Sequence, residues 1–240
     1  MGKFFTVEVK PTIAASIANL GVYADDDLVF DWTSFEIPRG AAKLVEASII
    51  ARGGQSFALN LFFAKTVDNV APGSLGTLHA TAGGTGGGFQ NHVLGATQSE
   101  ETDVRTGLDV LMVANSGQGG RYQPNLVLEG EPDSGTNVGY DKLYIAATTP
   151  DGEPSFASTM LVSTQTATNT TALVVKSLSA LTYADKNDVL HDEDNQVIGT
   201  IKSITDATNI VLKENCASVS AVDKKLYNIN PITIRLMFEK

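Results

Sequence analysis

The feature that most constrains the fold is a series of short apolar segments near the C-terminus, separated by turn residues at fairly regular intervals. Residues 188–190, 197–201 and 208–212 carry the pattern, and Asp and Asn, which satisfy turn backbones with their own side chains, stand between them. Such spacing predicts a small β-structured unit. One further strand-like run, 232–238, follows this unit and is not needed to complete it. We expect that run to return to the N-terminal part of the chain, which makes the small unit an insertion.

The remainder of the chain also favours strands over helices. Residues 4–9 and 28–37 alternate in period two, as half-buried strands do. Two apolar runs, 42–51 and 57–64, are joined by Arg52-Gly53-Gly54-Gln55-Ser56, which predicts a hairpin with a short loop. No stretch sustains apolar spacing at i, i+3, i+4 and i+7 over several turns.

These patterns predict an all-β protein in two parts. The main domain is expected to be a β-sandwich, jelly-roll-like, formed by residues 1–157 together with 229–240. The second part is expected to be a small inserted β-barrel at 158–228. A charged fraction of 18%, below the usual quarter or so, and 22 glycines agree with strands joined by many turns.

A long glycine-rich stretch, 68–107, looks like a loop. It has few apolar anchors, and a structureless segment of this length is unusual inside a compact domain. We therefore expect it to be functional or to be ordered by contact with a neighbouring subunit. A second polar loop follows at 115–125. Loop length and composition predict subunit contacts within 78–93 and 117–122, at these residues: Gly83, Gly84, Gly86, Gly87, Phe89, His92, Arg121 and Tyr122.

Charge and cysteine content exclude several classes of partner and site. The net charge of −10 disfavours binding to phosphate backbones and to anionic membranes, so neither a nucleic acid nor a membrane is an expected partner. No apolar run reaches the ~18 residues of a membrane span. Cys216 is the only cysteine, so neither an intramolecular disulfide nor a thiolate zinc site is expected.

Motifs for catalysis are missing. The glycine cluster at 83–88 lacks the Gly-Lys-Ser/Thr ending of a phosphate loop, and Asp25-Asp26-Asp27 lacks the ligand spacing of a calcium loop. The acidic segment 191–195 fits a hairpin turn, and no Gly-x-Ser-x-Gly elbow is present. Trp32 is expected in the core because it lies within an alternating strand. We therefore expect no catalytic residue, no cofactor and no metal.

The small unit resembles a known type of module. The phrases Asp188-Val189-Leu190, Val197-Ile198-Gly199-Thr200-Ile201 and Thr208-Asn209-Ile210-Val211-Leu212 are similar to those of SH3-like small barrels in bacteriophage virion proteins, with Asn187 where a glycine is usual. Two N-terminal phrases, 31–40 and 59–64, look like those of structural proteins of tailed phages of aquatic bacteria.

The resemblance implies a virion structural role and supplies no catalytic residue. It suggests a capsid decoration (cement) protein that is oligomeric and binds the major capsid protein or other virion proteins. The lack of disulfides suits folding in the bacterial host cytoplasm before assembly into the virion. Two alternatives stay open. A carbohydrate- or receptor-binding module of a tail or fibre would need an exposed aromatic platform, and a hydrolase would need a cleft with two facing carboxylates of raised pKa.

Overall fold

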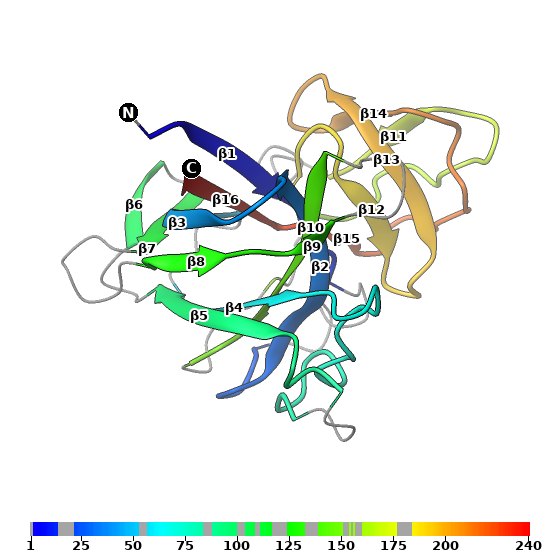
Figure 1. Ribbon diagram of the computed structural model, residues 1–240. Coiled ribbons are helices and arrows are strands. Elements are labelled where there is room, and N and C mark those ends of the chain that lie inside the picture. Colours follow the sequence, from blue (N-terminus) through cyan, green and yellow to red (C-terminus); the bar gives the residue numbers. More distant parts are fainter. Residues whose placement is uncertain are drawn as a thin grey trace.

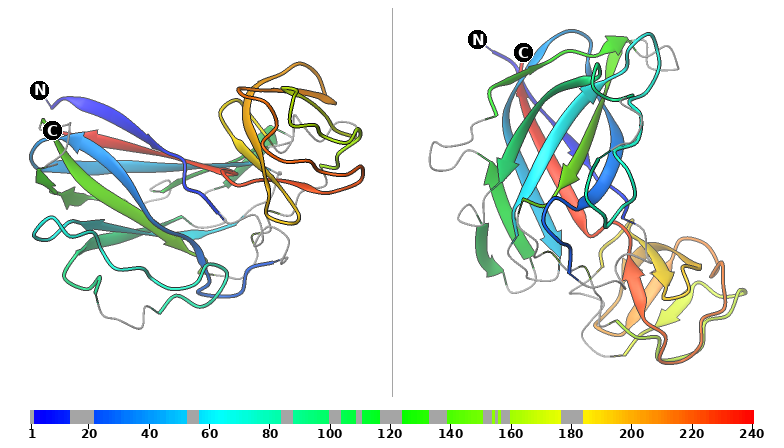
Figure 2. Two further views of the ribbon diagram at one scale, coloured as in Figure 1. Left: turned by 90° about the vertical axis from the view of Figure 1, so that its right-hand side faces the viewer. Right: turned by 90° about the horizontal axis from the view of Figure 1, so that it is seen from below.

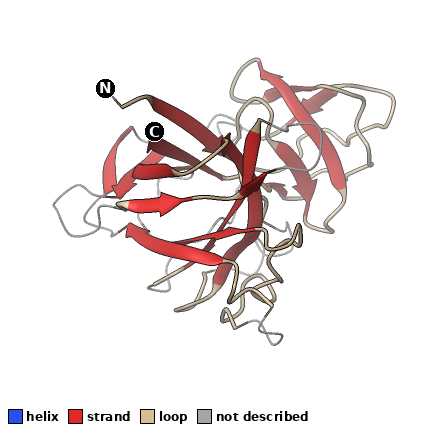
Figure 3. Ribbon diagram, in the orientation of Figure 1, coloured by secondary structure: helices blue, strands red, loops and turns tan. Residues whose placement is uncertain are grey.

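The computed structural model is built entirely of strands and connecting segments in the part of the chain that it describes (Figure 3). The described residues are 2–13, 22–52, 57–83, 88–99, 104–108, 111–116, 124–132, 139–150, 154, 156, 160–176 and 184–240. Within these ranges the strands form three antiparallel sheets, which confirms the predicted all-β class. No helix long and apolar enough to cross a membrane occurs among these residues.

The first sheet contains both ends of the chain. Its order is β1 (Phe4–Val9), β16 (Ile232–Glu239), β3 (Ala42–Arg52), β7 (Leu111–Ser116) and β6 (Val104–Leu108), and β8 (Leu126–Leu128) pairs with the start of β3 (Figure 1). The C-terminal strand β16 thus lies between the N-terminal strand and β3. This placement confirms that the run at 232–238 returns to the N-terminal part.

The second sheet covers one face of the first. Its order is β2 (Leu28–Pro38), β10 (Tyr140–Thr148), β4 (Leu59–Lys65) and β5 (Val93–Ser99), and β9 (Glu131–Pro132) pairs with the start of β10. Alternate residues of both sheets point into one hydrophobic core, as in a sandwich. In β16, for example, Ile232, Ile234, Leu236 and Phe238 are fully buried.

The third sheet belongs to the small unit at one end of the sandwich (Figure 2). Its order is β11 (Ala172–Val174), β14 (Asn209–Leu212), β13 (Val197–Ile204), β12 (Val189–Asp192) and β15 (Leu226–Asn228). A separate cluster of buried residues, drawn from 160–226, fills it. The pairing path is open from β11 to β15, so strand pairing does not close this sheet into a barrel. The domain boundaries stay predictions.

The predicted hairpin between 42–51 and 57–64 is wrong. The two runs form strands, but β3 belongs to the first sheet and β4 to the second. Both carry a buried stripe, for instance Leu44 and Ile49 in β3 and Leu61 and Phe63 in β4. Two such stripes can cover the same core from opposite sides as readily as they can lie side by side, because alternation records only which residues are buried.

Two further expectations need correction. The stretch 68–107 is not all loop, because β5 and most of β6 lie within it. Trp32 does not lie in the main core but is half-buried on the outer face of the second sheet, next to Leu28 and Ala146. The pairing of β2 with β10 shifts register twice near Ala147, and these shifts break the alternation from which the position of Trp32 was predicted.

The aromatic packing at the end of β16 allows a direct test of the sandwich. Phe238 is fully buried, and its ring stacks on Phe5 with centroids 5.2 Å apart and on Phe35 at 6.4 Å. We expect Phe238→Ala to lower the free energy of unfolding by about 3–5 kcal/mol, as for other buried Phe residues. Urea unfolding monitored by circular dichroism measures this loss. Val127→Ala, at an exposed position of β8, is the control and should change stability by less than about 0.5 kcal/mol.

Candidate functional site: an apolar pocket on the outer face of the second sheet

A segment that we call the strap, residues 71–83 and 88–92, crosses the outer face of the second sheet. Main-chain hydrogen bonds join it to the start of β2: His79 N–H donates to the carbonyl of Leu28 (2.9 Å), and Leu28 N–H donates to that of Ala80 (3.0 Å). A third bond runs from Ala82 N–H to the carbonyl of Asp26 (3.0 Å). The strap is therefore fixed by main-chain hydrogen bonds to the β2 edge of the second sheet.

Side chains of β2 hold the strap at a second place. The indole Nε1–H of Trp32 donates to the carbonyl of Gly73 (3.0 Å). Asp31 Oδ1 accepts the N–H of Leu75 (3.1 Å) and also that of Trp32 (2.9 Å). Within the strap, Gly83 N–H donates to the carbonyl of Leu75 (3.0 Å). These bonds fix the position of Leu75 above the sheet.

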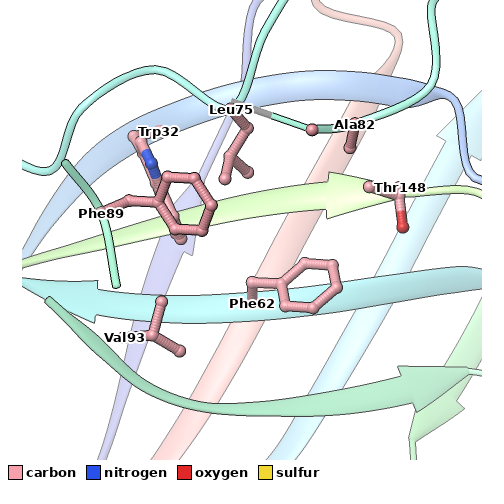
Figure 4. Close-up of a pocket in the computed structure, with 8 residues that line it drawn as sticks. Trp32, Phe62, Leu75, Ala82, Phe89, Val93 and Thr148 are labelled. Atoms are coloured by element: carbon pink, nitrogen blue, oxygen red, sulfur yellow. The ribbon is translucent and has the colours of Figure 1, made fainter. Parts of the chain in front are cut away.

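Between the strap and the sheet lies a pocket of about 190 Å³. Strands and strap contribute equally to its lining, which consists of Trp32, Phe62, Val93 and Thr148 from the strands and Leu75, Ala82, Gly83 and Phe89 from the strap (Figure 4). The pocket lies on the face of the sheet opposite the main core, because Trp32, Leu75 and Phe89 belong to a hydrophobic cluster separate from it.

The chemistry of the lining favours binding of an apolar group. Thr148 is its only polar side chain, and no titratable side chain takes part. An apolar cavity of about 150 Å³ is large enough to bind benzene. The pocket can therefore take a side chain the size of Phe or Leu, and it has no acid or base with which to catalyse a reaction.

The structure places some of the predicted contact residues at this pocket. Gly83 and Phe89 line it, which sequence reasoning did not foresee beyond their membership of one loop. His92 is buried, and its ring Nδ1 lies 2.9 Å from the carbonyl of Lys65, which gives it a role within the fold. The remaining predicted contacts lie outside the described residues: Gly84, Gly86, Gly87, Arg121 and Tyr122. Subunit contact stays a prediction for all eight.

A buried polar cluster joins His79 of the strap to the segment just before β2. Asp27 Oδ2 is 3.8 Å from Nδ1 of His79 and accepts the N–H of Ala24 (2.9 Å). The ring of Tyr23 packs on that of His79, with centroids 4.4 Å apart. Burial, followed by the charge of Asp27, raises the pKa of Tyr23, so its phenol stays neutral at physiological pH. Among the described residues neither the Tyr23 hydroxyl nor His79 Nε2 has a hydrogen-bond partner.

A second buried carboxylate, Asp188, stands where the small unit joins the sandwich. It accepts hydrogen bonds from Nδ2 of Asn228 (2.7 Å) and from the N–H of Asp185 (2.8 Å). Two cations of the sandwich face it, with Lys10 Nζ at 3.4 Å from Oδ1 and Arg52 Nε at 3.9 Å from Oδ2. Burial raises the pKa of Asp188, against the opposing effect of these donors and cations.

The surroundings of Asp188 differ from the site that the hydrolase alternative requires. That alternative requires two facing carboxylates of raised pKa, whereas the groups that face Asp188 are the cations Lys10 and Arg52. No group of three or more His, Cys, Asp or Glu residues positioned to hold a metal ion occurs in the described part of the chain. Comparison of the chain with protein-family models, curated proteins and solved structures gave no match.

The single tryptophan makes the strap testable by fluorescence. We expect Leu75→Ala to shift the emission of Trp32 to longer wavelength, because removing this side chain admits water above the indole. We also expect the variant to lose about 2 kcal/mol of stability or more. Val70→Ala, at an exposed position just before the strap, is the control and should leave the emission unchanged. An unchanged emission spectrum in Leu75→Ala would contradict the packing of the strap, through Leu75, against Trp32.

The raised pKa of Asp188 gives stability a defined pH dependence. As the pH rises above the ordinary Asp value of ~3.9, the unfolded chain loses this proton before the folded chain does, so the contribution of Asp188 to stability falls. Above the folded-state pKa that contribution is constant. Asp188→Asn has no such proton. We therefore expect its free energy of unfolding to rise relative to that of the wild type as the pH increases from the unfolded-state to the folded-state pKa of Asp188. Urea unfolding at a series of pH values measures the difference.

Asp206 provides a control of opposite sign. Hydrogen bonds, first from the N–H of Thr208 and then from the side chain of Asn209, lower the pKa of this exposed carboxyl group. Its stabilising effect is present above the unfolded-state pKa and is lost as the pH falls. The free energy of unfolding of Asp206→Asn should therefore fall relative to that of the wild type as the pH rises. Parallel pH profiles for Asp188→Asn and the wild type would show that burial does not raise the pKa of Asp188.

Proposed function

We propose that this chain is a non-enzymatic virion structural protein of a tailed bacteriophage, and specifically a capsid decoration (cement) protein. In this proposal it is a homo-oligomer, binds the major capsid protein or other virion proteins, and is assembled into the particle in the bacterial host cytoplasm. Support comes from the phage-like phrases of the small unit and from the chemistry of the pocket, which suits contact and not catalysis.

The pocket is the observation that carries the proposal. Both main-chain and side-chain hydrogen bonds hold its strap on the sheet, so the pocket exists before any partner binds. An apolar side chain that fills such a preformed space is removed from water at little ordering cost, and full burial of a Phe or Leu side chain stabilises by about 1.5–3 kcal/mol. Val93, which is 39% exposed, marks the open side through which such a side chain would enter.

We further propose that the small unit is an SH3-like barrel. The segment around Leu161 and Val162 supports this, because it bonds to both edges of the open sheet. Leu161 forms a bridge with Lys225, next to β15, and Val162 forms one with Val175, next to β11. Main-chain bonds from Leu226 N–H to the Met160 carbonyl (2.8 Å) and from Val162 N–H to the Lys224 carbonyl (2.9 Å) strengthen the first of these links.

A glycan- or receptor-binding module of a tail or fibre is the alternative, and the described residues favour it less. Such a module needs an exposed aromatic platform. Trp32 is half-buried beneath the strap, and its indole N–H is already bonded to Gly73. Tyr140 is exposed, but it lies at the start of β10 and outside the pocket lining.

Copy number in purified particles tests the proposal as a whole. Mass spectrometry of particles of the phage that encodes this chain should find it in many copies, in a fixed ratio to the shell protein. A handful of copies would favour the tail or fibre alternative. Absence from the particles would contradict a virion role.

The pocket itself is tested by truncating Phe89. We expect Phe89→Ala to weaken binding to particles that lack the protein by about ten-fold or more, the effect of losing ~1.4 kcal/mol at a contact that buries an aromatic ring. Tyr140→Ala removes an exposed ring from the same sheet outside the pocket and should bind as the wild type does. Equal binding by the wild type and Phe89→Ala, with both folded, would assign particle contact to another surface.

A further inference from the structure

Strand β1 leaves one edge of the first sheet open. It pairs with β16 in an uninterrupted register from Phe4↔Glu239 to Val9↔Ile234, and within the described residues it has no partner strand on its other side. Lys3 and Lys240 exchange two main-chain hydrogen bonds (3.0 and 2.9 Å). In an antiparallel ladder such bonded pairs alternate with non-bonded ones. The N–H and C=O groups of Phe4, Thr6 and Glu8 consequently point away from β16, towards the open edge.

Within the described part of the chain, this edge has little of the usual protection against pairing. Proteins blunt exposed edges with proline, lysine, bulges or a covering segment. Residues 4–9 contain neither proline nor lysine, and their register with β16 has no bulge. Their one charged residue, Glu8, forms an ion pair with Arg235 of the neighbouring strand β16 (3.3 Å). The corresponding edge of β2, by contrast, is bonded to the strap through Leu28 and His79.

Side chains of β1 also leave apolar surface uncovered. Phe4 is 62% exposed on the outer face of the strand. Phe5 and Val7 point to the inner face and pack against the main core, but they are only half-buried because the sheet ends beside them. Figure 2 shows β1 at the edge of the first sheet. Another strand laid alongside it would cover apolar side chains on both faces.

We propose that this strand is β1 of a second copy, paired antiparallel about a two-fold axis so that the two first sheets become one continuous sheet. Such an axis requires that the outward-pointing residues of one copy pair with those of the other. Only a register centred on Thr6 uses all three of them, with Thr6 opposite Thr6 and Phe4 opposite Glu8. In that register Phe5 faces Val7 of the other copy on the inner face, where both sandwich cores then continue across the junction.

Self-complementarity is the reason for choosing a second copy as the occupant. One register satisfies the main-chain groups of three residues and covers the two half-buried apolar residues, Phe5 and Val7, with each other. A foreign strand would have to supply the same alternation independently. The inference rests on the homo-oligomer part of the proposed function, but it is tested on purified protein alone. Failure to bind particles would therefore not contradict the dimer, and a monomeric protein would not by itself contradict binding to particles.

Charge substitution at the symmetric position tests the register. Sedimentation analysis of the wild type should give a dimer of twice 25.3 kDa. Thr6→Asp and Thr6→Lys each place like charges opposite each other, and we expect each to weaken self-association about three-fold or more at low salt. An equimolar mixture of the two should regain the association of the wild type, because opposite charges then face each other.

A second pair of variants separates pairing from folding. Thr6→Pro removes an N–H that points away from β16, so the fold should persist while the dimer dissociates. Thr6→Val keeps this N–H and should remain dimeric, and equal thermal unfolding of the two variants checks that both are folded. The proposal is overturned by a wild type that is monomeric at about 100 μM, which corresponds to an association free energy weaker than ~5.5 kcal/mol. A dimer that Thr6→Pro leaves intact, or a charge-variant mixture that fails to regain association, would overturn it as well.

Discussion

The architecture depends on one pairing of strands that are far apart in sequence. β16 inserts between β1 and β3, and its buried residues fill the centre of the first sheet. Because the strands of the small unit come before β16 in the sequence, the sandwich core is complete only once β16 is in place. The small unit has its own cluster of buried residues, so the two cores are connected by the chain and by the contacts at the junction, not by shared packing.

The junction shows how such a return is fixed. Arg52 N–H at the end of β3 donates to the carbonyl of Pro231 just before β16 (3.1 Å), and Ile13 N–H donates to that of Ile229 (2.8 Å). Asp188 lies in the same region, buried between cations of the sandwich. Burying a carboxylate costs free energy even when it is paired, and Asp188 bears this cost beside Lys10 and Arg52. This cost is the same effect that raises the pKa of Asp188.

The sequence allowed the class of fold, most strands and the return of β16 to be predicted, because period-two alternation and turn residues are local signals. Which strands pair with one another was harder to predict. β3 and β4 carry the alternation of a hairpin, yet they lie in opposite sheets, since alternation says nothing about which strand lies alongside. The pocket was unpredictable for a related reason: Trp32 and Phe89 are far apart in sequence and meet only because main-chain bonds seat the strap on β2. The glycine content identified the strap as a candidate contact segment, but it gave no sign that apolar residues of the strap would line a pocket.

The strap and β1 illustrate two outcomes for the edges of the same sandwich. At β2 the chain covers its own edge, and the strap that does so creates a pocket on the adjoining face. At β1 the described chain supplies no cover, although Phe4 is exposed, Phe5 and Val7 are half-buried and main-chain groups point outward. An uncovered edge of this kind is a hazard for a protein that must stay in solution, but it is useful to one whose role is to assemble, because pairing satisfies many main-chain groups with a single symmetric contact. The two proposals place contact with a partner at the pocket of the second sheet and contact between copies at the β1 edge of the first, so both contacts could form at once.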